Sequence, residues 1–86
     1  MMQFELEFFG PLQDRLGART DTMRTTAAPV TVDDLIALVA ESKPGGDALR
    51  APHIRLAIND KMIARNAPLS LADGDRIAFM SPFSGG

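Results

Sequence analysis

The sequence predicts an α+β domain in which one main helix covers one face of a mixed or antiparallel sheet of about five strands. Short segments with alternating apolar residues recur along the chain, as half-buried strands require, and just one segment sustains a helical period. The chain has 86 residues, of which 45% are hydrophobic and 23% charged, enough for the core of a single small domain. We expect this domain to span residues 1–80 and a flexible tail to span residues 81–86.

The first predicted strand covers residues 3–9. Phe4, Leu6 and Phe8 alternate with polar residues and with Phe9, so one side of the strand faces a core. The break that follows this strand is supplied by glycine and proline. We therefore expect the chain to leave the sheet directly after Phe9.

The next segment contains a short helical turn and a second strand. Residues 12–16 have helical composition but stop at Gly17, which is suited to a helix end. Residues 19–26 are rich in threonine, and Thr20 and Thr22 alternate along them. Because threonine favours extended backbone, we expect an edge strand here.

The one substantial helix begins after Thr31, whose side chain is suited to cap it. Asp33 and Asp34 fall in the first turn, where carboxylates complement the helix dipole. Apolar residues with helical spacing form one stripe: Val32, Leu35, Ile36 and Val39, extended by Leu38. The helix is expected to end before the Pro-Gly-Gly sequence at residues 44–46, after which residues 47–50 have the composition of a short turn.

The second half of the chain predicts three strands. Residues 54–58 alternate in polarity, the following Asn59-Asp60 suits a tight hairpin, and residues 61–64 return as a short strand. A second turn signal, Asp73-Gly74-Asp75, precedes a last strand over residues 77–80. Ile77 and Phe79 are expected to point inward.

A single helix covers only one face of the sheet, so the other face is expected to be open. If the strand registers are right, the open face carries Phe9, Ala57, Ala78 and Met80. Such a patch is too apolar to be left in water without a use. We expect it to dock a partner, with Phe83 as an anchor nearer the tail.

The composition argues against several classes of function. A net charge of −2 without runs of Lys or Arg makes nucleic acid and anionic membranes poor partners. The chain has no cysteine, which removes disulfides, thiol nucleophiles and zinc–thiolate sites. It also lacks a signal-peptide pattern or an apolar run of membrane-spanning length, so we expect a cytoplasmic protein.

No catalytic or metal-binding constellation stands out among the side chains. Asp73-Gly74-Asp75 lacks the further oxygen ligands of a calcium loop, and a lone His53 has no companion ligands, so we assign no metal site. The chemically distinctive group is the carboxylate of Gly86. A Gly-Gly ending arises by chance about 0.5% of the time and has the thinnest possible profile, although an appended or frayed tail would look the same. The ionised carboxylate must be activated, for instance as an acyl-adenylate, before anything attacks it.

These segments resemble the ubiquitin-like β-grasp sulfur carriers, and specifically the small subunit of molybdopterin synthase. The order of elements agrees over the whole chain. The match is densest in Ala57-Ile58-Asn59, Pro68-Leu69, Asp73-Gly74-Asp75, Ile77-Ala78-Phe79 and the ending Ser81-Pro82-Phe83-Ser84-Gly85-Gly86. The combination is far more specific than the two terminal glycines alone.

The resemblance implies that an ATP-dependent, E1-like activating enzyme adenylates Gly86 and that a sulfur donor protein converts it to a thiocarboxylate. The tail would then enter the active site of a large catalytic subunit and give its sulfur to a pyranopterin. On this view the chain binds no cofactor and is not catalytic alone. The implied partner-binding residues are Phe9, Ala57, Ala78, Met80, Ser81, Pro82, Phe83, Ser84 and Gly85. The first and last strands would lie side by side and parallel.

Two departures from the family pattern and three alternatives accompany the resemblance. The family often has Pro-Pro-Val where this chain has Ser81-Pro82-Phe83, and Glu where it has Arg76. A sulfur carrier for the thiazole of thiamine would share the fold and the terminus. A ubiquitin-like modifier would use the activated terminus to acylate lysines, and a plain interaction domain would not use it chemically.

Overall fold

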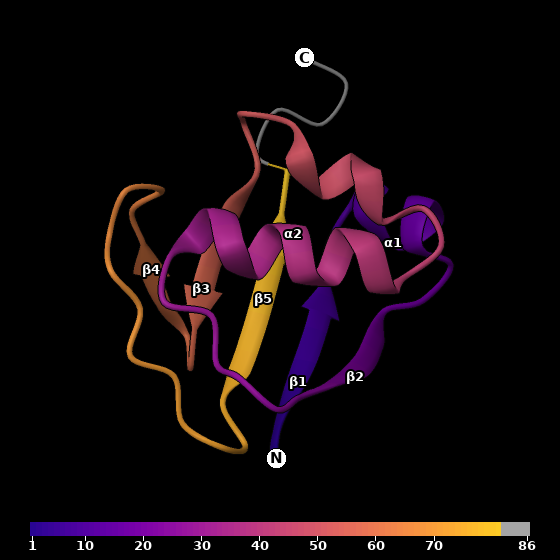
Figure 1. Ribbon diagram of the computed structural model, residues 1–86. Coiled ribbons are helices and arrows are strands. Elements are labelled where there is room, and N and C mark those ends of the chain that lie inside the picture. The colour runs from indigo at the N-terminus through magenta and orange to yellow at the C-terminus, as the bar shows by residue number, and fades with distance from the viewer. Residues whose placement is uncertain (82–86) are drawn as a thin grey trace.

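The computed structural model describes residues 1–81, and they form a sheet layer and a helix layer (Figure 1). The sheet has the strand order β2-β1-β5-β3-β4, and α2 crosses one of its faces. Its strands are β1 (Met2–Phe8), β2 (Thr20–Thr25), β3 (Arg55–Ile58), β4 (Lys61–Ile63) and β5 (Arg76–Met80). The helices are α1 (Pro11–Leu16), α2 (Val32–Ser42) and the 3-10 helix η1 (Gly46–Arg50). The predicted α+β class is confirmed.

The two ends of the domain meet in the middle of the sheet, where β1 and β5 pair in parallel. Leu6 lies opposite Ile77 and Phe8 opposite Phe79, and the other strand pairs are antiparallel. The predicted inward side chains of both strands are buried in one core. The mixed sheet and the parallel pairing implied by the resemblance are therefore confirmed.

Helix α2 begins and packs as its sequence predicts. The Thr31 hydroxyl accepts a hydrogen bond from the backbone N–H of Asp34 at 3.0 Å, which satisfies one of the free donors of the first turn. The apolar stripe faces the sheet and is buried: Val32, Leu35, Ile36 and Val39, with the half-buried Leu38 beside it. Burial of this stripe supplies the main contact between the two layers.

Several boundaries differ slightly from the predicted ones. Strand β1 ends at Phe8 instead of Phe9, although the Phe9 N–H still donates to the carbonyl of Phe79 at 3.0 Å. Strand β4, at the edge of the sheet, ends at Ile63 instead of Ala64. The predicted hairpin is confirmed, since Asn59 and Asp60 adopt the left-handed conformation with φ of 51° and 70°.

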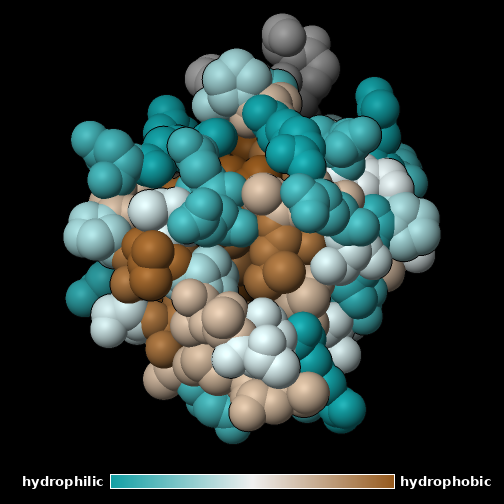
Figure 2. Space-filling model, in the orientation of Figure 1, coloured by the Kyte–Doolittle hydropathy of each residue, from teal (hydrophilic) through white to brown (hydrophobic). Residues whose placement is uncertain are grey.

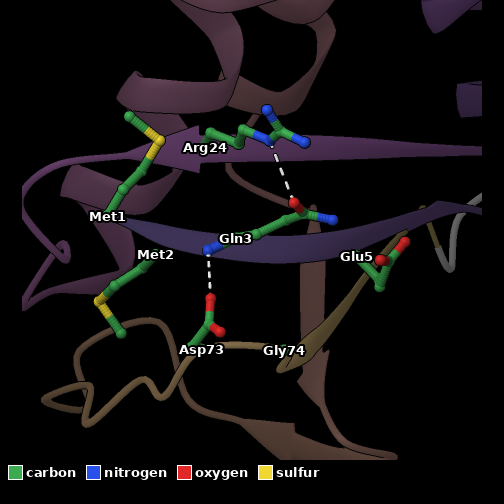
Figure 3. Close-up of a pocket in the computed structure, with 7 residues that line it drawn as sticks. All are labelled: Met1, Met2, Gln3, Glu5, Arg24, Asp73 and Gly74. Atoms are coloured by element: carbon green, nitrogen blue, oxygen red, sulfur yellow. Dashed lines mark hydrogen bonds between the residues drawn. The ribbon is translucent and has the colours of Figure 1, made fainter.

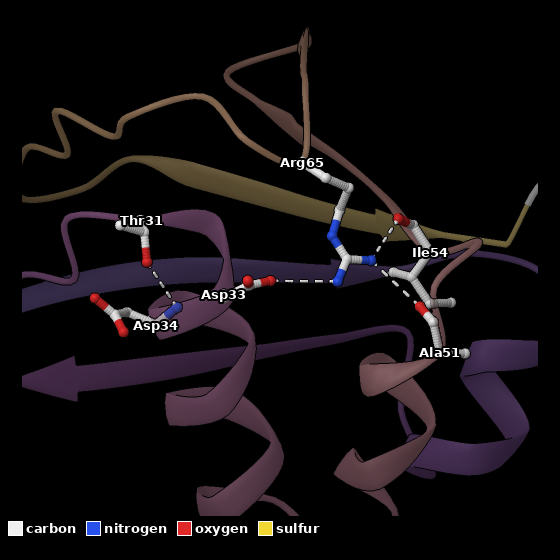
Figure 4. Close-up of polar contacts among 6 residues, drawn as sticks. All are labelled: Thr31, Asp33, Asp34, Ala51, Ile54 and Arg65. Carbon is white, nitrogen blue, oxygen red and sulfur yellow. Dashed lines mark hydrogen bonds and ion pairs between the residues drawn. The ribbon is translucent and has the colours of Figure 1, made fainter.

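Arg65, in the connection after β4, ties three separate segments together (Figure 4). Its guanidinium donates to the carbonyl oxygens of Ala51 and Ile54, both at 3.3 Å. The same group lies 3.4 Å from a carboxylate oxygen of Asp33 in the first turn of α2. The long connection between β4 and β5 is thereby held against the helix layer.

The face that carries α2 is mostly polar where the helices are exposed (Figure 2). Hydrophilic residues gather over the upper part of this view, and more apolar residues lie below, over the connections that flank the sheet. Within residues 1–81, no helix is both long and apolar enough to cross a membrane.

The close contact between η1 and α2 depends on Gly46. A Cβ atom at this position would lie 2.7 Å from both the Cα and the carbonyl oxygen of Ala40. Backbone atoms of a packed helix cannot move aside cheaply. Glycine is therefore required here by the space available.

We expect Gly46→Ala to lower the free energy of unfolding by about 1–3 kcal/mol, because overpacking forces η1 away from α2. Asp47→Ala is the matched control, since Asp47 is exposed and its ion pair with Arg50 lies on the surface. Urea titration of both variants measures the difference. Equal stability of the two variants would contradict the required contact.

Candidate functional site

The predicted carrier tail begins where the described part of the chain ends. Five predicted site residues lie outside the described residues: Pro82, Phe83, Ser84, Gly85 and Gly86. The structure describes Met80, the last residue of β5, and the half-buried Ser81 that follows it. The surroundings of these two residues define the platform from which the tail departs.

The sheet face opposite α2 carries an apolar surface next to this platform. Phe9 follows β1 and lies beside Met80, because the parallel register of β1 and β5 continues through its bond to Phe79. Phe9 is 45% exposed, while Met80 and Ala78 are half-buried. The predicted placement of these three site residues on the open face is confirmed.

The prediction for Ala57 needs a correction. Its register places it on the open face, opposite Ala78 and Met62, but it is only 6% exposed. A short side chain between two neighbouring strands leaves little of itself in contact with water. Met62, which is 57% exposed, instead supplies the accessible surface at this end of the row.

Sequence reasoning missed Met62, although a signal was present. The Asn59-Asp60 turn fixes the register of β3 and β4, and this register sets Met62 directly across from Ala57. We call the complete set the outer apolar patch, and it comprises Phe9, Ala57, Met62, Ala78 and Met80. Charged residues adjoin it, since Glu7 lies opposite Ala78 and Arg55 opposite Met80. An apolar centre with a polar rim is typical of a protein interface.

A hollow of about 300 Å³ lies beside the start of the tail. Arg15 of α1 and the exposed His53 contribute its basic groups. The other lining residues are Pro11, Leu12, Ala48, Ala51, Ile54 and Ser81. The carboxyl end of β5 therefore emerges between the outer apolar patch and a hollow with basic groups on its wall.

Asn59 and Asp75 hold the opposite end of β5 in place. The Asn59 side-chain amide donates to an Asp75 carboxylate oxygen at 2.9 Å, and its carbonyl oxygen accepts from the backbone N–H of Arg76 at 3.0 Å. The other Asp75 oxygen accepts from the N–H of Ala72 at 2.8 Å. The oxygens of this turn are thus engaged in fixing where β5 begins.

Asp73 plays a similar structural part at an open hollow of about 400 Å³ (Figure 3). Its carboxylate accepts from the N–H of Gln3 at 2.6 Å, and the Gln3 side chain accepts from Arg24 at 3.1 Å. The Gly74 N–H also donates to the carbonyl of Gln3 at 2.7 Å. The polar groups drawn here bind mainly one another, which closes the turn onto β1.

Metal chemistry finds no support in the part of the chain that the structure describes. No group of three or more His, Cys, Asp or Glu side chains gathers among residues 1–81 in a way that suits a metal ion. The prediction that Asp73-Gly74-Asp75 is a turn is confirmed by its contacts and by the positive φ of 87° at Gly74.

Comparison with protein families gives one match that spans nearly the whole chain. A model described as the ThiS family matches residues 6–86, which include the terminal glycines. Comparison with curated proteins gives no significant match.

Solved structures share the fold over almost their full length. SAMP1 from Haloferax volcanii is 25% identical with a TM-score of 0.75, and the alignment covers 98% of this chain and 99% of that one. A complex of subunits 1 and 2 of molybdopterin-converting factor from Helicobacter pylori gives 28% identity, a TM-score of 0.61 and coverage of 99% and 100%. A putative molybdopterin converting factor subunit 1 from Pyrococcus furiosus, 13% identical with a TM-score of 0.73 over 95% and 99%, supports the fold alone. The ubiquitin-like β-grasp fold is confirmed.

The contacts of Asn59 give a prediction that separates its side-chain bonds from its backbone conformation. Asn59→Gly removes both hydrogen bonds, which should cost about 1–2 kcal/mol of unfolding free energy. Asn59→Ala should cost about 1 kcal/mol more, because Ala resists the left-handed conformation. Chemical denaturation measures both variants. An Ala variant as stable as the Gly variant would show that the positive φ is not maintained.

Proposed function

The chain belongs to the ThiS family of ubiquitin-like sulfur carriers, and we propose that it is the small subunit of a molybdopterin synthase. In this role it delivers sulfur as a thiocarboxylate on Gly86 to a pyranopterin held by a large catalytic subunit. The likeness to a chain in the complex of subunits 1 and 2 of the Helicobacter pylori molybdopterin-converting factor supports this assignment within the family.

The observation that carries the proposal is the continuity of the outer apolar patch with the start of the tail. Met80 belongs to the patch and also ends β5, one residue before Ser81. A large subunit that covers the patch therefore lies next to Ser81, where the tail begins. In this proposal the folded domain binds the large subunit, and the terminal glycines enter its active site.

The chemistry is divided between this chain and its partners. The Gly86 carboxylate attacks the α-phosphate of ATP on the activating enzyme, which forms an acyl-adenylate and releases pyrophosphate. Sulfide released by the donor protein then attacks the acyl carbon, a C–S bond forms, and AMP leaves with the original carboxylate oxygen, which gives the thiocarboxylate. The chain contributes the carboxylate, its reach and a thin profile, and it binds no cofactor in this scheme.

A ubiquitin-like modifier is the second candidate, favoured by the similarity to SAMP1 from Haloferax volcanii over nearly both full chains. The activation step is the same for both functions, but the acyl group is passed to an amine instead of accepting sulfur. A thiazole-forming sulfur carrier would share the thiocarboxylate and differ in the acceptor. The three functions therefore separate at the product.

Coexpression with an E1-like activating enzyme and a sulfur donor tests these functions by intact mass. We expect the mass shift of a sulfur-for-oxygen exchange at Gly86, followed by loss of that sulfur to a pyranopterin when the large subunit is added. Adducts of this chain with other proteins, without the exchange, would instead indicate a modifier. A thiocarboxylate that a thiazole synthase consumes and the large subunit does not would contradict the molybdopterin assignment.

The reach and profile of the tail give a prediction that is independent of fold stability. Deletion of Gly86, or addition of one residue after it, should abolish sulfur transfer and leave the melting temperature unchanged, because the changes lie beyond β5. Gly85→Ala and Gly85→Val should lower adenylation and transfer in proportion to side-chain size. Full activity of the Val variant would show that the glycines are only a tether.

The outer apolar patch gives a prediction for complex formation. Met80→Asp and Met62→Asp should each weaken binding of the large subunit at least tenfold, about 1.4 kcal/mol, because each buries a charge in the interface. Val30→Asp is the matched control, since Val30 is 62% exposed and lies in the connection before α2, outside the patch. Calorimetric titration measures the affinities. Equal weakening by all three variants would argue against a docking role for the patch.

A further inference from the structure

The two lysines of the chain have opposite surroundings. The Lys43 ammonium donates to the carbonyl oxygen of Thr22 at 2.9 Å and lies 3.0 Å from a carboxylate oxygen of Asp21. Its side chain is only 21% exposed. The Lys43 amine therefore links the end of α2 to the edge strand β2.

The contact with Asp21 is maintained by more than the lysine. The backbone N–H of Thr22 and, after it, Lys43 lower the pKa of the Asp21 carboxyl. The carboxylate is therefore ionised over the whole neutral range and remains available to pair with Lys43. An amine held in a hydrogen bond and an ion pair is less accessible as a nucleophile than an exposed amine without a partner.

Lys61 is placed differently, at the first position of the short edge strand β4. It is exposed, and within residues 1–81 its amine makes no hydrogen bond or ion pair. The neighbouring Asp60 carboxylate is occupied by Arg76 at 2.7 Å. Asp60, the acidic residue next to Lys61 in the sequence, is thus paired with Arg76.

Lys61 also lies at the other end of the sheet from the start of the tail. It pairs with Ile58, and Ile58 pairs with Ile77 near the beginning of β5, whereas the tail follows Met80 at its end. Figure 1 shows the turn between β3 and β4 at the lower end of the sheet, while β5 runs upward. Lys61 and Met80, after which the tail begins, therefore lie at opposite ends of the sheet.

We propose that Lys61 is an acceptor site for the activated carboxyl terminus of a second copy of this chain. The proposal rests on the proposed activation of Gly86. The unprotonated Lys61 amine attacks the acyl carbon of the acyl-adenylate, a C–N bond forms, the bond from carbon to the AMP oxygen breaks, and the amine proton passes to solvent. Because Lys61 lies at the end of the sheet away from Met80, the linkage joins different surfaces of the two copies, and such a heterologous contact repeats into an open chain.

The first experiment uses the full chain with the activating enzyme and ATP, without a sulfur donor. We expect a species with the mass of two chains less one water, and peptide mapping should place the amide on Lys61. Lys61→Arg should reduce this species at least tenfold, and Lys43→Arg should leave it unchanged. Linkage through Lys43 or the Met1 amine to a similar extent, or a single chain less one water, would overturn the proposal.

A second arm separates this proposal from the proposed function. The full chain is prepared with a thioester at Gly86 by cleavage from an intein, so that no activating enzyme is needed, and the amine then displaces a thiol. Pyrophosphate release without linkage at Lys61 would leave activation intact and overturn the acceptor site. Absence of pyrophosphate release would count against the proposed function, while the thioester chain still decides whether Lys61 is the acceptor.

The environment of Lys43 supplies an internal control in the same thioester assay. Asp21→Asn removes the paired carboxylate and should raise linkage at Lys43 severalfold, with linkage at Lys61 unchanged. An unaltered ratio between the two lysines would show that pairing does not decide which amine reacts, and would contradict the argument.

Discussion

The parallel pairing of β1 with β5 is the constraint on which the rest of the structure depends. Parallel neighbours cannot be joined by a hairpin, so the intervening chain must cross over the sheet, and α2 supplies that crossing. The stacked rings of Phe8 and Phe79, 5.7 Å apart, lie in the core along this seam. Parallel pairing also brings the carboxyl ends of both strands to the same end of the sheet, which is why Phe9 lies beside Met80.

The two ends of β5 have different roles in this arrangement. Asn59 and Asp75 fix the beginning of the strand through bonds to its turn and backbone, whereas the end of the strand leads into the tail beside the outer apolar patch. Polar contacts at the beginning of β5 thus fix the strand whose last residue, Met80, comes directly before Ser81.

The sequence alone predicted the elements whose signals are local. Alternation placed Phe4, Leu6 and Phe8 in the core, and Thr31 marked the start of α2. Strand pairing is not local, so the parallel neighbours followed from the family resemblance. The accessibility of Ala57 and Met62 depends on how adjacent strands cover one another. The contacts of Arg65 with Ala51 and Asp33 join segments that are far apart in the chain. Neither feature has a periodic signature.

The proposed activation of Gly86 makes the amines of the chain relevant, because an amine is a nucleophile toward an acyl-adenylate. Most of the basic residues of the chain are arginines, and just two are lysines. A guanidinium stays protonated at any ordinary pH, so arginine can supply positive charge without offering a nucleophile to an acyl-adenylate. Of the two lysines, Lys43 is committed to Asp21 and Thr22, while Arg76 takes the acid beside Lys61. On the proposal that Lys61 accepts the activated terminus, charge pairing on the surface selects which amine reacts, although each such pair adds little to stability.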